Sequence, residues 1–186
     1  MAELEVIARE LGGFQTNCYI VANVQTKDAI VIDPAWNADE IYRLIQDKGY
    51  VCRGIYLTHG HVDHMAAMAD LKKLTGVCTY ASEDEKEVLG NSRVNLSAMM
   101  TSVFQRVIET ETDQYLQDGD VRKILDTEMR CISVPGHTRG GMCYYFEEEN
   151  ILFSGDTLFR YSVGRSDFPT GDENALLENI REKLFV

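Results

Sequence analysis

The stretch from Thr58 to His64 reads T-H-G-H-V-D-H and places three of the chain's four histidines beside a carboxylate. On a helix, His59 and His61 would point about 200° apart, so they can face one point only from a loop or a strand end. Gly60 between them makes a tight loop possible. We therefore predict a loop that turns these imidazoles toward a common point.

The segments on either side of this loop predict a strand before it and a helix after it. Residues 54–57 form a β-type run, and residues 65–74 carry apolar side chains at helical spacing. Further strands are predicted over 4–7, 19–21, 29–32, 77–80, 129–134, 142–146 and 151–154, and further helices after cap residues Asn37, Ser82 and Thr170. Strands mixed with helices indicate a single layered α/β domain over residues 1–186.

Length and composition suit one ordinary globular domain. The chain has 186 residues, 45% of them hydrophobic and 26% charged. A formal net charge of −12 disfavours nucleic acid as a partner. No apolar run approaches the roughly 20 residues of a membrane span, and the first residues lack the pattern of a signal peptide. We therefore expect no membrane association and a cytoplasmic location.

The five cysteines lie singly in apolar, strand-like runs, and none forms a C-x-x-C pair. This pattern predicts reduced, buried thiols rather than disulfides or a zinc cluster. The residues concerned are Cys18, Cys52, Cys78, Cys131 and Cys143.

The histidine stretch supplies ligands for a metal ion. Neutral imidazole and carboxylate are groups that zinc, iron and manganese bind, and His59, His61, Asp63 and His64 offer four of them at one turn. The alternative is a polar helix N-terminus that Asp63 caps. The density of imidazoles favours the metal site.

Three more candidate residues follow predicted strands, where loops often build sites. His137 is a structural histidine when considered alone, but it can complete a tetrahedral set with His59 and His61. Asp156 is either a further ligand or a turn residue. Asp33 is interpreted as a turn residue or as a group that supports a ligand through a hydrogen bond.

The order T-H-G-H-V-D-H, P-G-H-T and S-G-D-T-L-F resembles the metallo-β-lactamase superfamily, and most of all its small glyoxalase II-like (hydroxyacylglutathione hydrolase-like) enzymes. The resemblance implies a four-layer αββα sandwich with two divalent metal ions at one edge. Zinc is the expected metal, and iron or manganese is the alternative. By resemblance, the first ion is held by His59, His61 and His137, the second by Asp63 and His64, and Asp156 bridges them.

The resemblance also implies a reaction. Two such ions lower the pKa of a shared water from 15.7 toward about 7, so that a metal-bound hydroxide can attack a small-molecule ester or, preferably, a thioester. Asp63 can orient that hydroxide as well as bind metal. Three alternatives remain open: oxidation of persulfides at a single iron, β-lactam hydrolysis, and a metal-binding scaffold without catalysis.

The sequence departs from the family pattern in two respects. Family members have a further histidine past the last helix, on the second metal, whereas no histidine follows His137 here. True glyoxalase II enzymes also have a helical C-terminal domain that helps to hold glutathione, and nothing in this chain corresponds to it. We therefore expect a chain shortened at its C-terminus after Phe185 and Val186, with a missing strand and a weakened second metal site. Its oligomeric state is not predicted.

Overall fold

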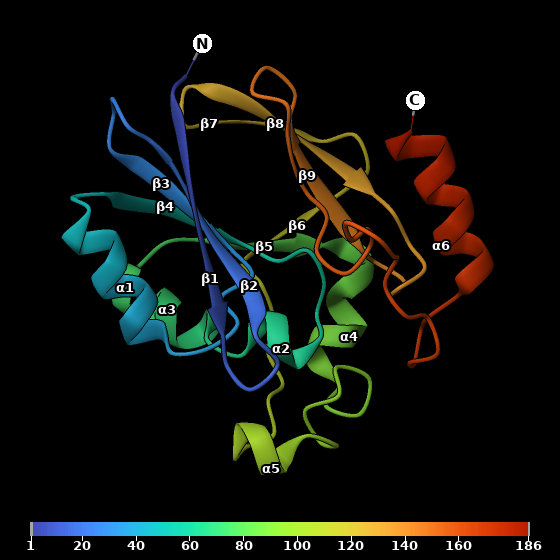
Figure 1. The fold of residues 1–186 in the computed structure, drawn as a ribbon. Helices are drawn as coiled ribbons and strands as arrows, with labels where there is room; N and C mark the ends of the chain where they lie inside the picture. Colours follow the sequence, from blue (N-terminus) through green and yellow to red (C-terminus); the bar gives the residue numbers. More distant parts are fainter. Residues whose placement is uncertain (1, 186) are drawn as a thin grey trace.

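Two β-sheets stack face to face and carry helices on both outer faces (Figure 1). The protein is described here by a computed structural model that covers residues 2–185. The predicted αββα layers are confirmed. The order of the layers follows from the strands, which bury side chains on both faces and must be covered on both sides.

The first sheet has the strand order β1-β2-β3-β4-β5-β6. Strands β1 to β3 pair antiparallel, and β3 to β6 pair parallel. In β2, Ile20 faces the helices while its neighbour Val21 faces the second sheet, as the two-residue period of a strand requires. The strands are β1 (Leu4–Leu11), β2 (Thr16–Asn23), β3 (Asp28–Ile32), β4 (Val51–Tyr56), β5 (Thr79–Ser82) and β6 (Gln114–Leu116).

The second sheet has the order β10-β9-β8-β7, and all of its strands pair antiparallel. Its edge strand β7 was not predicted, because its sequence V-R-K-I alternates exposed and half-buried residues and has no apolar run. The strands are β7 (Val121–Ile124), β8 (Thr127–Ser133), β9 (Met142–Phe146) and β10 (Ile151–Phe153).

Helices α1 (Ala38–Asp47) and α3 (Met68–Thr75) pack on the first sheet, and α6 (Glu173–Asn179) covers the second and continues into the π-helical turn η2 (Ile180–Leu184). Among the described residues, none of the helices has the length and apolar character needed to cross a membrane. The short helices are α2 (Val62–Met65), the 3-10 turn η1 (Glu83–Glu85), α4 (Lys86–Gly90) and α5 (Thr101–Phe104).

Two of the three predicted helix caps, Asn37 and Ser82, are confirmed, and the third, Thr170, is wrong. The Ser82 hydroxyl accepts a hydrogen bond from the Asp84 backbone N–H at 3.3 Å. The Asn37 side chain accepts a hydrogen bond from the Glu40 backbone N–H and donates one to the Glu40 carboxylate. At α6, Asp172 rather than Thr170 accepts from the Ala175 N–H, at 3.0 Å. Helix α6 begins at Glu173, so Asp172 directly precedes its first turn, whereas Thr170 lies two residues further from it.

All five cysteines are free, and four are buried as predicted. Cys78 is exposed, so the prediction of burial is wrong at that position. The reason is that β5 begins at Thr79, whereas the predicted strand began at Val77. At the end of the described chain Phe185 is 68% exposed, and Val186 lies outside the described residues.

Aromatic residues fill the space between the two sheets next to the histidine stretch. The Tyr56 and Tyr144 rings meet edge to face with centroids 5.5 Å apart. The Tyr144 hydroxyl, from β9, donates to the Leu57 carbonyl at 2.6 Å. The Tyr144 bond therefore ties the second sheet to the chain just before Thr58.

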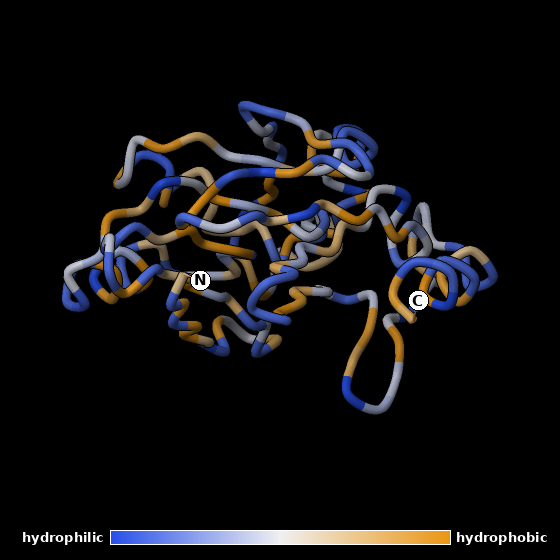
Figure 2. Tube along the Cα trace, turned by 90° about the horizontal axis from the view of Figure 1, so that it is seen from above, coloured by the Kyte–Doolittle hydropathy of each residue, from blue (hydrophilic) through white to orange (hydrophobic). Residues whose placement is uncertain are grey.

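Figure 2 shows hydrophobic segments in the strands that cross the middle of the molecule and hydrophilic segments at several loop tips.

We predict that Tyr144→Phe lowers the free energy of unfolding by about 1–3 kcal/mol, because the buried Leu57 carbonyl loses its donor. Denaturant unfolding of the full chain measures this change. Tyr115→Phe is the matched control, since the buried Tyr115 hydroxyl has no hydrogen-bond partner among the described residues. Equal effects of the two substitutions would contradict the proposed tie between the sheets.

Candidate metal centre

The predicted site residues gather at one end of the sandwich, in helix α2 and in loops that follow four strands. The histidine loop connects β4 to α2, and His137 lies between β8 and β9. Asp33 follows β3, and Asp156 follows β10. Residues from both sheets therefore meet at this end.

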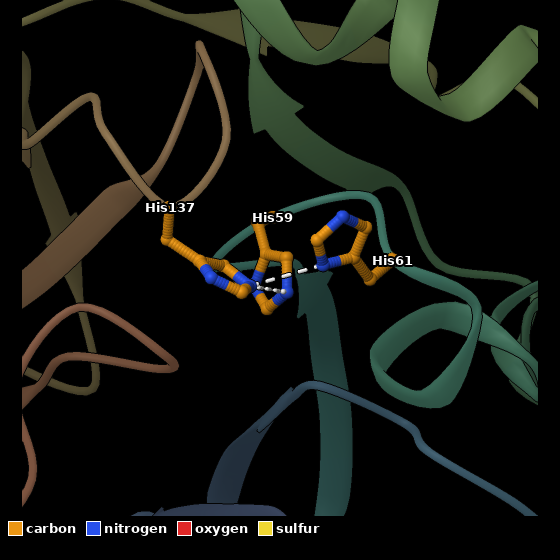
Figure 3. A group of neighbouring side chains, drawn as sticks. All are labelled: His59, His61 and His137. Atoms are coloured by element: carbon orange, nitrogen blue, oxygen red, sulfur yellow. Dashed lines mark hydrogen bonds between the residues drawn. The ribbon is translucent and has the colours of Figure 1, made fainter. Parts of the chain in front are cut away.

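Three imidazole nitrogens converge on one point (Figure 3). The Nε2 atom of His137 lies 3.0 Å from His61 Nδ1 and 3.2 Å from His59 Nε2. His59, His61 and His137 are each 2% exposed. The structure thus brings together the three histidines that the resemblance assigns to the first metal.

Hydrogen bonds on the far sides of the rings determine which nitrogens carry a proton. The Thr58 hydroxyl donates to Asp33 Oδ2, so the contact of 3.1 Å between Thr58 Oγ1 and His59 Nδ1 is an N–H donated by the histidine. His137 Nδ1 donates to the Arg165 carbonyl at 2.6 Å. The Nε2 atoms of His59 and His137 therefore present lone pairs to each other.

The ionisation of the cluster also fits a bound cation. Burial lowers the pKa of His59 well below its usual value, and burial together with His137 and His64 lowers the pKa of His61 to about 3. The rings are thus neutral near pH 7. Neutral imidazoles with converging lone pairs repel one another unless a cation lies between them, and three nitrogens form the protein part of a tetrahedral zinc site.

A second cluster lies beside the first. His64 Nε2 is 3.3 Å from Asp156 Oδ1 and 3.6 Å from Asp63 Oδ2. Ligand atoms of His59, His64 and Asp156 lie within 4.8 Å of one another. Burial alone lowers the pKa of His64, but Asp63, Asp33 and Asp156 together raise it well above its usual value. Negative charge has therefore accumulated around His64, which suits a second cation.

Asp33 supports both clusters without belonging to either. Its Oδ1 accepts the Thr58 N–H at 2.7 Å, and its Oδ2 accepts the Thr58 hydroxyl at 2.7 Å and His64 Nδ1 at 2.9 Å. The bond to His64 leaves the Nε2 atom free to face Asp156. Asp33 therefore holds the His64 ring through a hydrogen bond, which is the contact that its interpretation as a supporting group predicts.

Asp63 lies at the edge of the site and is held by a residue that the sequence did not single out. Thr16, at the start of β2, donates its hydroxyl to Asp63 Oδ2 at 2.9 Å. Asp63 is not part of either compact ligand group, although its carboxylate lies near His64. No local pattern marks Thr16, because it meets Asp63 only after β2 and α2 have packed.

The αββα fold and the adjoining histidine and carboxylate clusters define a metal-dependent hydrolase. The chain belongs to the metallo-beta-lactamase superfamily, whose sequence model matches residues 11–185. The family and the fold that the motifs implied are therefore confirmed.

Individual relatives span almost the whole chain. The hydroxyacylglutathione hydrolase GloC of Haemophilus influenzae is 32% identical over 177 residues, which cover 92% of this chain and 80% of that protein. The B3 metallo-beta-lactamase BLEG-1 matches with a TM-score of 0.89 and 31% identity, over 97% of this chain and 85% of that one. TTHA1623, solved in a di-iron-bound form, matches with a TM-score of 0.82 and 28% identity, over 97% of this chain and 86% of that one.

We predict that His61→Ala lowers the amount of bound metal and the activity together, because a direct bond to the cation is lost and only water can replace it. Elemental analysis of the purified variant measures the metal. Asp118→Asn is the control, since the Asp118 carboxylate binds Ser133 and Lys183 instead of the histidines. Full metal content in His61→Ala would exclude His61 as a ligand.

Proposed function

We propose that the protein hydrolyses thioesters of a small thiol with the help of two divalent cations. The observation that carries this proposal is the adjacency of the two ligand clusters, which have His59 in common. The likeness to GloC, a hydroxyacylglutathione hydrolase, supports a thioester as the substrate. The likeness to a di-iron-bound protein supports two cations.

Two cations held by these clusters would lower the pKa of a shared water to about 7 and would polarise the substrate carbonyl. The chain's own residues hold and orient the reactants. The side chains of Asp63 and Asp156 are 24% and 33% exposed, while that of His64 is 4% exposed, so the carboxylates are the groups that solvent and substrate reach. In this proposal Asp63, fixed by Thr16, orients the attacking water. A thiolate leaves without a strong general acid.

β-Lactam hydrolysis is the second candidate, because BLEG-1 shares 31% identity over almost the whole chain. A chromogenic cephalosporin distinguishes it from thioester hydrolysis. Oxygen uptake with a persulfide, measured on iron-loaded protein, tests the oxidoreductase alternative. Full metal content without turnover of any of these substrates would favour a scaffold.

We predict that thioester hydrolysis falls at acid pH, along a limb with an apparent pKa of about 7. The water must lose a proton before it attacks, so the rate rises as the pH increases through this value. A panel of acyl thioesters assayed at several pH values measures the limb, and His61→Ala serves as the blank. A rate that does not change between acid and neutral pH would contradict this mechanism.

We further predict that the two cations bind with unequal affinity. The first cluster offers three imidazoles, whereas the second offers His64 with the carboxylates of Asp63 and Asp156. Titration of metal-free protein with zinc should therefore show one tight site and one weaker site, and iron and manganese are titrated for comparison. Two equally tight cations per chain would show that the second cluster is complete.

A further inference from the structure

A buried carboxylate outside both ligand clusters connects the loops that carry the first of them. Glu85, in η1, is 0% exposed. Its Oε2 accepts the Gly60 backbone N–H at 2.5 Å, and its Oε1 accepts the Gly140 N–H at 2.9 Å. Gly60 separates His59 from His61, and Gly140 follows His137 in the loop between β8 and β9. One side chain therefore joins the two ligand loops through their backbones.

We propose that Glu85 is a positioning residue that fixes the distance between the His59–His61 loop and the His137 loop, and thereby sets the affinity of the three-imidazole site for a divalent cation. This inference rests on that site and not on the identity of the substrate. It follows from a geometric requirement: the three nitrogens come from both loops, and Glu85 is bonded to both.

The glycines show how closely the loops approach Glu85. A Cβ added at Gly60 would lie 2.8 Å from Glu85 Oε2. A Cβ added at Gly140 would lie 2.6 Å from the Glu85 backbone nitrogen. Both distances are shorter than real Cβ contacts, so a side chain at either glycine would displace Glu85 or the loop that carries the glycine.

The chemistry of these contacts requires a carboxylate. Burial raises the pKa of Glu85, while the N–H groups of Gly60 and Gly140 oppose that shift by bonding to the charged form. Both oxygens accept, which is the pattern of an ionised carboxyl group. A glutamine has only one carbonyl oxygen, so its NH₂ group would face a backbone N–H and leave that donor unpaired.

The test is a zinc titration of the full chain, made metal-free, against a competing chelator. Glu85→Gln should weaken the tight site by about 10–100-fold, the usual effect of removing a group that orients ligands. Cobalt(II) in the same site should show a changed absorption spectrum, because the ligand geometry changes. Asp113→Asn is the matched control: Asp113 also accepts a backbone N–H, from Thr79 at 2.9 Å, but it does not bond to a ligand loop.

Substitutions at two glycines, Gly140 and Gly90, test the contact between Glu85 and the His137 loop from the loop. Gly140→Ala pushes against Glu85, whereas Gly90 has nothing within 4 Å of an added Cβ. We expect Gly140→Ala to weaken zinc binding and Gly90→Ala to leave it unchanged. Unchanged zinc affinity in Glu85→Gln, or an equal loss in Asp113→Asn, would overturn the inference.

A measurement without metal separates this inference from the proposed function. In the metal-free protein, the amide resonances of Gly60 and Gly140 should move in Glu85→Gln, since each N–H loses or changes its acceptor. Resonances that stay in place would overturn the inference. A wild-type chain that binds zinc tightly without hydrolysing thioesters, and loses that affinity in Glu85→Gln, would reject the proposed function and support the role of Glu85.

Discussion

The candidate metal centre depends on the carboxylate of Asp33, which accepts three hydrogen bonds from the chain that carries the histidines. Two come from Thr58 and one from His64. Through the Thr58 hydroxyl, the same carboxylate also determines which nitrogen of His59 carries its proton. A buried charge is stable only when its lone pairs are satisfied, so the end of β3 and the histidine loop can adopt one mutual arrangement.

Much of the site could be predicted from the sequence, because its candidate ligands are dense along the chain. His59, His61 and His64 lie within six residues of sequence, in the loop after β4 and in α2, and the end of a strand marks His137. The role of Asp33 could be narrowed to two possibilities from its place after a strand. These residues carry local signals, either a spacing or a position at the end of an apolar run.

The remaining parts depend on tertiary contacts that no local pattern records. Glu85 fits a capping box with Ser82, yet its carboxylate reaches Gly60 and Gly140 instead. Thr16 meets Asp63 across 47 residues of sequence. Strand β7 is recognisable only by its pairing with β8, since an edge strand needs no apolar face. Pairing and packing decide such features after the local elements have formed.

The contact between His137 and His59 spans 78 residues of sequence and joins loops of different sheets. The second sheet is built from neighbouring antiparallel strands, which form from local contacts, whereas this contact must wait until the two sheets meet. A cation held there would act as a removable cross-link between the two halves of the chain. It would stabilise the docked state in proportion to the logarithm of its concentration, so metal supply would also govern how long the folded chain survives.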